Sequence, residues 1–131
     1  MSQPEVPDTP RVRVGRVYVP REGSWARVLV DRLWPRGLTH ERADLDWWCK
    51  DVSPSTELRR WYHTNDQYPL FRIRYQDELA LEPRCSALEA LRGLSLERGV
   101  VLLTATQNTH ISQAAVICDL LGGEPTVTPG D

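Results

Sequence analysis

Residues 25–37 read WARVLVDRLWPRG, an apolar run that leads into a charged, rigid turn. Val28, Leu29 and Val30 are consecutive apolar residues, which is typical of a strand covered on both faces. We therefore predict a buried strand over residues 25–33. Residues 100–103 show the same apolar pattern and predict a second buried strand, while the recurring valines of residues 12–19 predict a third.

Segments with helical spacing of apolar residues separate the predicted strands. Helices are expected from about Leu38, after Ser55, after Asn65-Asp66, over residues 86–96 and after His110. In the first of these, Leu45 and Trp48 are three residues apart and share a helix face. Apolar strands separated by helices predict an α/β fold, a single small domain over residues 11–123 with a short, mainly parallel sheet flanked by helices. We expect a disordered tail at residues 1–10, and a tail or a short edge strand at residues 124–131.

The composition of the 131 residues excludes several classes of protein. Lys plus Arg is 16 and Asp plus Glu is 18, which gives a net charge of −2 and no bulk positive charge for nucleic acid or an anionic membrane. No apolar run approaches the roughly 18 residues of a membrane span, and the N-terminus has no apolar signal core, so we expect a cytoplasmic protein without a membrane partner. The three cysteines are scattered without a CxxC spacing, so we expect no metal, and no known cofactor fingerprint is present.

Polar segments follow both buried strands, at residues 31–37 and 104–110. In open α/β sheets, ligands bind beyond the carboxyl ends of the strands. Arg32 and Arg36 flank Trp34 and the rigid Pro35, and a guanidinium group is suited to bidentate recognition of a carboxylate or phosphate. The alternative is structural, with Arg32 paired to a nearby carboxylate such as Asp44 or Asp46 and Trp34 in the core.

Further polar candidates surround the turn at Pro54. Lys50 is the only lysine in the chain, Ser55 is suited to cap a helix, and Arg59 lies in the first turns of that helix. The start of this helix is a candidate seat for an anion, and the alternative is a capped helix with solvated charges. Asp31 and Lys50 are the candidates to handle a proton, although Asp31 is equally suited to orient an arginine.

Residues 31–37 (DRLWPRG) resemble the YeaO-like group of small bacterial proteins in the domain of unknown function 488 (DUF 488) family. The resemblance extends over most of residues 12–121, and its matching segments are Val17-Tyr18, residues 28–37, Lys50-Asp51, residues 54–59 with Trp61, residues 71–75 and residues 102–105. It implies a compact α/β domain but supplies no reaction. It also implies one site made from the retained motif positions Asp31, Arg32, Trp34, Pro35, Arg36, Lys50, Ser55 and Arg59. Similar members often have a histidine at about the position of Gln113, and His110 is the histidine that lies nearby here.

The leading hypothesis is a pocket for a small anionic ligand, either phosphate or nucleotide-like. Its ligand-binding residues would be Arg32, Trp34, Arg36, Ser55 and Arg59, and its candidate catalytic residues Asp31 and Lys50. Whether the chain is an enzyme stays open. One alternative is a nucleic-acid-binding or regulatory module, which the net charge disfavours. The other is a non-catalytic interaction domain, in which exposed tryptophans drive a homodimer; the candidates are Trp25, Trp47, Trp48 and Trp61.

Overall fold

The structure of the protein is a computed structural model, which describes residues 9–123. Most of the predicted amino-terminal tail and all of the predicted carboxyl-terminal tail or edge strand lie outside the described residues. Within residues 9–123, no helix combines the length and the apolar character needed to cross a membrane.

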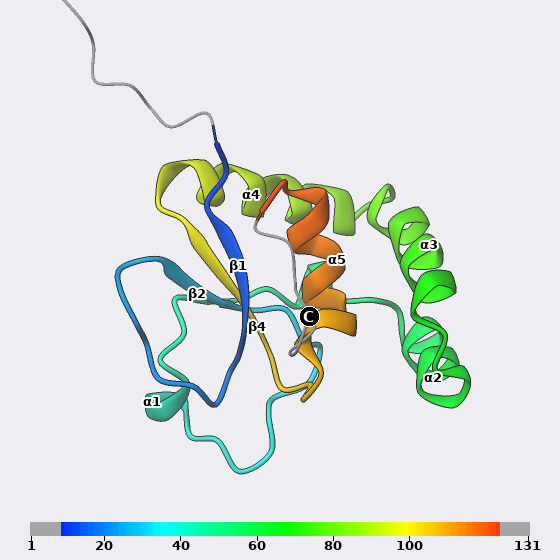
Figure 1. The fold of residues 1–131 in the computed structure, drawn as a ribbon, viewed down its shortest axis with the longest axis horizontal. Helices are drawn as coiled ribbons and strands as arrows, with labels where there is room; N and C mark the ends of the chain where they lie inside the picture. The colour runs from blue at the N-terminus through cyan, green and yellow to red at the C-terminus, as the bar shows by residue number, and fades with distance from the viewer. Residues whose placement is uncertain (1–8, 124–131) are drawn as a thin grey trace, which may run out of the picture.

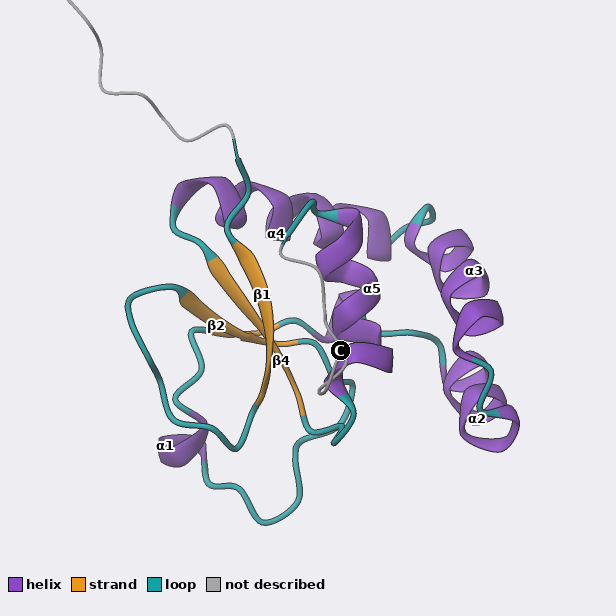
Figure 2. Ribbon diagram, in the orientation of Figure 1, coloured by secondary structure: helices purple, strands orange, loops and turns teal. Residues whose placement is uncertain are grey.

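Four parallel strands form one sheet in the order β1-β4-β2-β3 (Figures 1 and 2). The strands are β1 (Val12–Arg16), β2 (Ala26–Leu29), β3 (Trp47–Trp48) and β4 (Val100–Thr104). In the register of the sheet, Leu102 of β4 lies between Val14 of β1 and Val28 of β2. This arrangement confirms the predicted α/β fold with a small parallel sheet.

The two central strands are buried on both faces, as their continuous apolar sequences predict. Every residue of β2 and β4 is buried. On one face Val28 and Leu102 pack into a cluster with Ile117, and on the other Leu29 and Leu103 pack with a second, smaller cluster. Because both sides of the sheet are covered, the ends of β2 and β4 are held in a fixed relation to each other.

Helices cover one face of the sheet and extend beyond it. Helix α5 packs on β1 and β4, α3 packs against α5, and α2 packs against α3, so that α2 and α3 lie on the far side of α5 from the sheet (Figure 2). A single helical turn, α1, lies near the other end of the molecule (Figure 1). The bounds are α1 (His40–Ala43), α2 (Thr56–Asn65), α3 (Tyr68–Leu79), α4 (Arg84–Glu97) and α5 (Gln113–Leu120), with 3-10 turns η1 (Lys50–Val52) and η2 (Thr109–Ile111).

Helix α2 begins and ends where local residues favour it. The Ser55 side chain accepts a hydrogen bond from the Leu58 N–H at 3.1 Å, which caps the helix. At the other end, Asp66 takes a left-handed conformation with φ of 51°, and its N–H donates to the Tyr62 carbonyl. The helix predicted after Ser55 is therefore confirmed.

The helix predicted from about Leu38 to Trp48 is wrong. Thr39 caps only the short α1, because Asp44 takes a left-handed conformation and ends the helix. Trp48 then lies in strand β3, where it pairs with Leu29 of β2. The three-residue spacing of Leu45 and Trp48 therefore does not mark a helix face, because the chain leaves α1 at Ala43 and returns to the sheet at β3. Strand β2 is also shorter than predicted and ends at Leu29.

Three of the four tryptophans proposed as an interface pack beneath a cation of the same chain. The Arg13 guanidinium lies 4.8 Å from the Trp25 ring centroid, and Arg74 lies 4.1 Å from that of Trp61. Lys50 lies 3.9 Å from the ring of Trp48. Such cation–π contacts cover apolar ring surface within one chain.

The turn between α4 and β4 requires glycine, which gives a first test of the fold. Gly99 has φ of +89°, and a Cβ there would lie 2.7 Å from the Trp25 ring. We expect Gly99→Ala to lower the free energy of unfolding by about 1–3 kcal/mol, measured by urea denaturation.

Gly93 provides the matched control. It lies within α4, and a Cβ there would meet no described atom within 4 Å. Gly93→Ala should therefore raise the free energy of unfolding by about 0.4–1 kcal/mol. Equal effects of the two substitutions would contradict this account of the turn.

Candidate functional site

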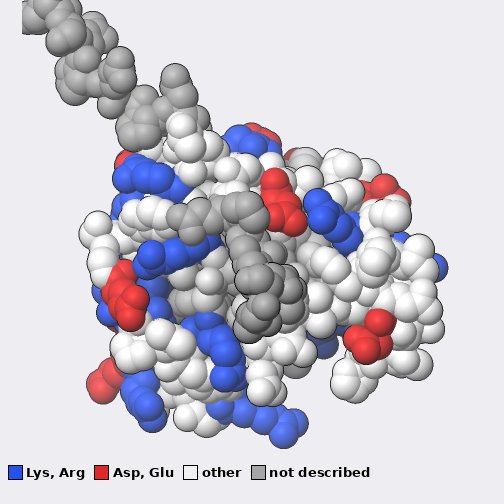
Figure 3. All heavy atoms as spheres, viewed as in Figure 1, with Lys and Arg blue, Asp and Glu red and all other residues white. Residues whose placement is uncertain are grey.

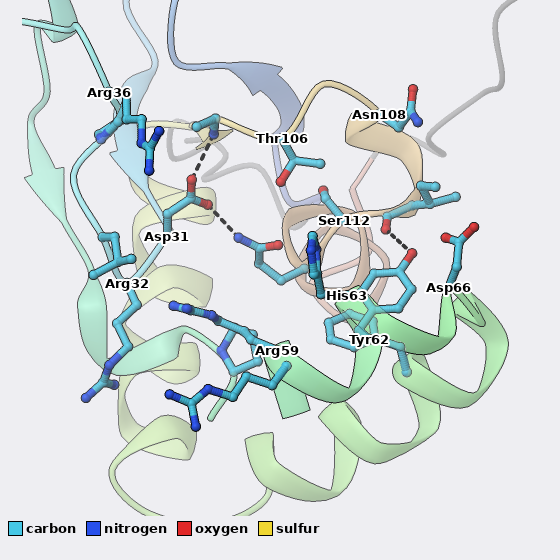
Figure 4. A pocket seen from close by; sticks show the side chains of 18 of the residues that line it. Asp31, Arg32, Arg36, Arg59, Tyr62, His63, Asp66, Thr106, Asn108 and Ser112 are labelled. Atoms are coloured by element: carbon cyan, nitrogen blue, oxygen red, sulfur yellow. Dashed lines mark hydrogen bonds between the residues drawn. The ribbon is translucent and has the colours of Figure 1, made fainter. Parts of the chain in front are cut away.

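A pocket of about 1030 Å³ opens at the carboxyl end of the sheet. Three segments form its walls, namely residues 31–36 after β2, residues 105–113 after β4, and one face of helix α2 (Figure 4). The two polar segments that follow the buried strands are thus brought together, as expected for an open α/β sheet.

Asp31 connects the two segments at the base of the pocket. One carboxylate oxygen accepts the Ala105 N–H at 2.8 Å, and the other accepts the Gln113 side-chain amide at 2.5 Å (Figure 4). The Asp31 carbonyl also accepts the indole N–H of Trp48 at 2.7 Å. Asp31 therefore holds together the ends of β2 and β4, the start of α5, and β3.

Burial raises the pKa of the Asp31 carboxyl above its ordinary value of 3.8. The Ala105 hydrogen bond and the positive charge of Arg59 act in the opposite direction. Each carboxylate oxygen already accepts a hydrogen bond from an uncharged amide group of the protein. Asp31 can hold a proton, but its position also gives it a structural role.

Four arginines line the pocket, namely Arg32, Arg36, Arg59 and Arg60. None of their guanidinium groups forms an ion pair or a side-chain hydrogen bond with the part of the chain that the structure describes. In Figure 4, Arg36 lies above Asp31 and Arg59 below it. The structural alternative for Arg32 is excluded, because Asp44 and Asp46 pair with Arg21 instead.

The pocket concentrates positive charge in a chain whose net charge is −2. Its lining holds four arginines against two acids, Asp31 and Asp66. In the view of Figure 3, Lys and Arg side chains gather over the sheet and the loop below it, whereas acidic side chains are scattered. Net charge is therefore a poor guide to the local field of this molecule.

Trp34 forms a rigid part of the wall. Its indole N–H donates to the Leu38 carbonyl at 2.6 Å, its ring stacks on His40 with centroids 4.0 Å apart, and its edge meets Trp48. Pro35 beside it is buried. The sequence left open whether Trp34 is a core residue or a ligand-binding residue. Its ring is packed against its neighbours and also lines the pocket.

Lys50 and Ser55 lie outside the pocket lining. The Lys50 ammonium is placed over Trp48, and Ser55 caps α2. The start of α2 is occupied by a carboxylate of the protein itself, because Glu78 accepts from the Ser55 N–H at 2.8 Å and from its hydroxyl at 2.5 Å. Of the predicted site residues, the pocket is therefore lined by Asp31, Arg32, Trp34, Arg36 and Arg59. Lys50 and Ser55 do not line it.

Helix α2 extends the pocket wall beyond Arg59, the lining residue of this helix that the sequence analysis had named. Arg59, Tyr62 and His63 are spaced at i, i+3 and i+4, so they share one helix face; all three line the pocket, as does Asp66, which ends the helix. This spacing was visible in the sequence. Burial raises the pKa of Tyr62 to about 12, so its hydroxyl stays protonated and donates to the Ile111 carbonyl at 2.8 Å.

Of the two residues considered for the last helix, Gln113 lines the pocket and His110 does not. His110 lies in η2, before the helix begins. The side chain that reaches Asp31 from α5 is therefore an amide, which fixes the carboxylate but has no titratable proton to exchange with it.

The fold and the pocket define a small α/β protein with a cationic hollow at the carboxyl edge of a parallel sheet. A family profile described as "Inactive DUF488-N3 subclade" matches residues 11–127. The chain therefore belongs to the DUF488 family, which confirms the resemblance seen in the DRLWPRG segment.

Similar chains come from several bacteria. Uncharacterized protein Rv3073c of Mycobacterium tuberculosis is 44% identical over 117 residues, which cover 86% of this chain and 95% of that protein. Uncharacterized protein YeaO of Escherichia coli is 38% identical over 112 residues, which cover 84% of this chain and 96% of YeaO. No solved structure matches significantly.

The half-buried carboxylate of Asp31 predicts a specific dependence of stability on pH. The pKa of Asp31 is higher in the folded protein than its ordinary value of 3.8 in the unfolded chain. In a pH window above 3.8, the folded protein therefore keeps a proton on Asp31 that the unfolded chain loses. The contribution of Asp31 to the free energy of unfolding should therefore fall as pH rises through that window. Asparagine at this position keeps an acceptor for Ala105 and a partner for Gln113, without the charge.

We accordingly expect Asp31→Asn to be at least as stable as the wild type at pH 7, and the difference to shrink towards pH 3.5. Urea denaturation of both proteins across this range measures it. A variant that is less stable by the same amount at every pH would show that the hydrogen bonds of the carboxylate outweigh its burial.

Proposed function

We propose that the pocket binds a small anionic ligand that carries a phosphate group. The observation that carries this proposal is the set of four pocket arginines that form no ion pair within residues 9–123. Guanidinium groups form strong, bidentate hydrogen bonds with phosphate oxygens. A phosphate ligand would supply the negative charge that this surface lacks.

Binding, rather than turnover, is the role that we propose for this chain. The family profile that it matches is described as inactive. Lys50, one of the two candidates to move a proton, lies outside the pocket lining, and both oxygens of the other, Asp31, accept hydrogen bonds from neutral groups. These observations support a sensor or carrier of a phosphorylated metabolite, a role that fits the cytoplasmic location expected from the sequence.

The shape of the site favours a small molecule over a nucleic acid. The arginines line a hollow, and pockets of roughly 300–1000 Å³ hold a drug-sized ligand. A single-stranded nucleic acid instead requires a long cationic groove with stacking aromatic side chains. The overall charge of −2 adds to this preference.

Titration with inorganic pyrophosphate at low salt tests the proposal. We expect binding by calorimetry, and a loss of about tenfold or more in affinity for Arg36→Ala and Arg59→Ala, because each removes a charged hydrogen-bond donor worth about 1.5–3 kcal/mol. The unliganded stability of Arg36→Ala should change by less than about 0.5 kcal/mol, because that exposed side chain has no described partner.

Arg42→Ala is the matched control. Arg42 is an exposed arginine on α1 that does not line the pocket, so its removal lowers the net charge equally. Pyrophosphate affinity should hardly change in this variant. Absence of binding to the wild type, or an equal loss in Arg42→Ala, would overturn the proposal.

The Asp31 carboxylate also predicts how binding depends on pH. Sulfate is a suitable probe because its charge is constant above about pH 3. As pH falls and Asp31 gains a proton, a negative charge leaves the pocket, so the affinity of the wild type for sulfate should rise several-fold. His63 also lines the pocket, and both proteins share it.

The comparison with Asp31→Asn isolates the effect of Asp31. This variant should bind sulfate more tightly than the wild type at pH 7 and should show a smaller change on acidification. Identical pH profiles for the two proteins would show that Asp31 does not oppose the anion.

A further inference from the structure

The pocket has a second end that the arginines do not occupy. In Figure 4, Asp66 and Asn108 lie on the opposite side from Arg32, Arg36 and Asp31, and His63 lies nearer the middle. The pocket is also far larger than a single phosphate ion requires. A ligand that fills both ends of the pocket must therefore have a charged group at the arginine end and a further part that reaches towards Asp66 and Asn108.

The side chains of the second end have unused hydrogen-bonding capacity. Within residues 9–123, the Asp66 carboxylate, the Asn108 amide, the Thr106 hydroxyl and the His63 ring form no side-chain hydrogen bond or ion pair. Asp66 is fixed by its backbone, whose N–H donates to the Tyr62 carbonyl at 2.9 Å. The carboxylate therefore stands at the end of α2 as an acceptor without a donor.

The chemistry of this end restricts what can lie there. A carboxylate repels a second anionic group, so a ligand with negative charges at both ends does not fit. Asp66 accepts only, whereas the Asn108 amide and the Thr106 hydroxyl both donate and accept. Hydroxyl groups, which also donate and accept, match this set.

The wall between the two ends is rigid and partly aromatic. The Tyr62 ring stacks on Phe71 with centroids 4.3 Å apart, and its hydroxyl is held by the Ile111 carbonyl. Both rings line the pocket. The middle of the ligand therefore faces an apolar surface, which suits a compact carbon ring or chain better than a further charged group.

We propose that the ligand is a phosphate ester of a sugar, with its phosphate at the arginine-lined end of the pocket and its hydroxyls towards Asp66 and Asn108. This inference rests on the proposed function, since it takes the arginine end to be the phosphate site. It adds that the second end of the pocket selects a hydroxylated, uncharged body.

Calorimetric titration with ribose 5-phosphate and inorganic phosphate tests the inference on the full chain. Ribose 5-phosphate should bind at least about tenfold more tightly than phosphate, a difference of about 1.4 kcal/mol. Asp66→Gly and Asn108→Ala should reduce that preference towards unity while phosphate still binds. Glycine suits the left-handed backbone at position 66, so the fold should tolerate the first variant.

Glu57→Ala is the control for Asp66→Gly. Glu57 is an exposed acid on the same helix, and it lies outside the pocket lining. Its removal should leave the preference for ribose 5-phosphate unchanged. Equal affinities for the two ligands, or a preference that survives both Asp66→Gly and Asn108→Ala, would overturn this inference alone. Failure of both ligands to bind would overturn the proposed function as well.

Discussion

The pocket depends on the hydrogen bonds of one half-buried carboxylate. Asp31 lies just beyond β2, and it accepts one bond from the main chain after β4 and another from the start of α5. Because β2 and β4 are neighbours in a parallel sheet, their ends already lie close together, and Asp31 fixes the loops that continue from them. The residues that follow Asp31 include Arg32 and Arg36, so the position of the cationic wall is determined by this contact. Burial of the carboxylate opposes its ionisation, and the Ala105 N–H, the Thr104 hydroxyl and the positive charge of Arg59 offset part of that cost.

The arginines of this chain differ in whether the protein itself satisfies them. Arg27 is buried, and its guanidinium donates to the carbonyls of Val17, Val19, Ala43 and Asp44. Arg21 pairs with two aspartates near α1. Those arginines hold loops together, whereas the four around the pocket have no such partners in the described chain. Four like charges around one hollow do not stabilise the fold, which is why we propose a ligand there.

The sequence predicted the central strands, helix α2 and the meeting of two polar loops, because each follows from a local pattern. The continuous apolar runs predicted β2 and β4, and a serine cap predicted the start of α2. Other features depend on residues distant in sequence. Glu78 occupies the start of α2 from 23 residues away, and only the folded chain shows it. Trp48 carries no local signal that distinguishes a short edge strand from a helix, since its pairing with Leu29 determines the outcome. Of the pocket face of α2, the sequence analysis named Arg59 but overlooked Tyr62 and His63, because they resemble a solvated surface.

Gln113 fits the description of the matching subclade as inactive. A buried carboxylate needs a donor for each oxygen, and the Gln113 amide meets that need at 2.5 Å. An amide has no proton to exchange at ordinary pH, so Asp31 and Gln113 together position the loops without forming an acid–base pair. The arginines of the proposed anion site come from the loop after β2 and from α2, and they do not depend on the chemical nature of residue 113 beyond its ability to donate. Binding of the proposed anion and proton transfer would therefore depend on different residues of this pocket.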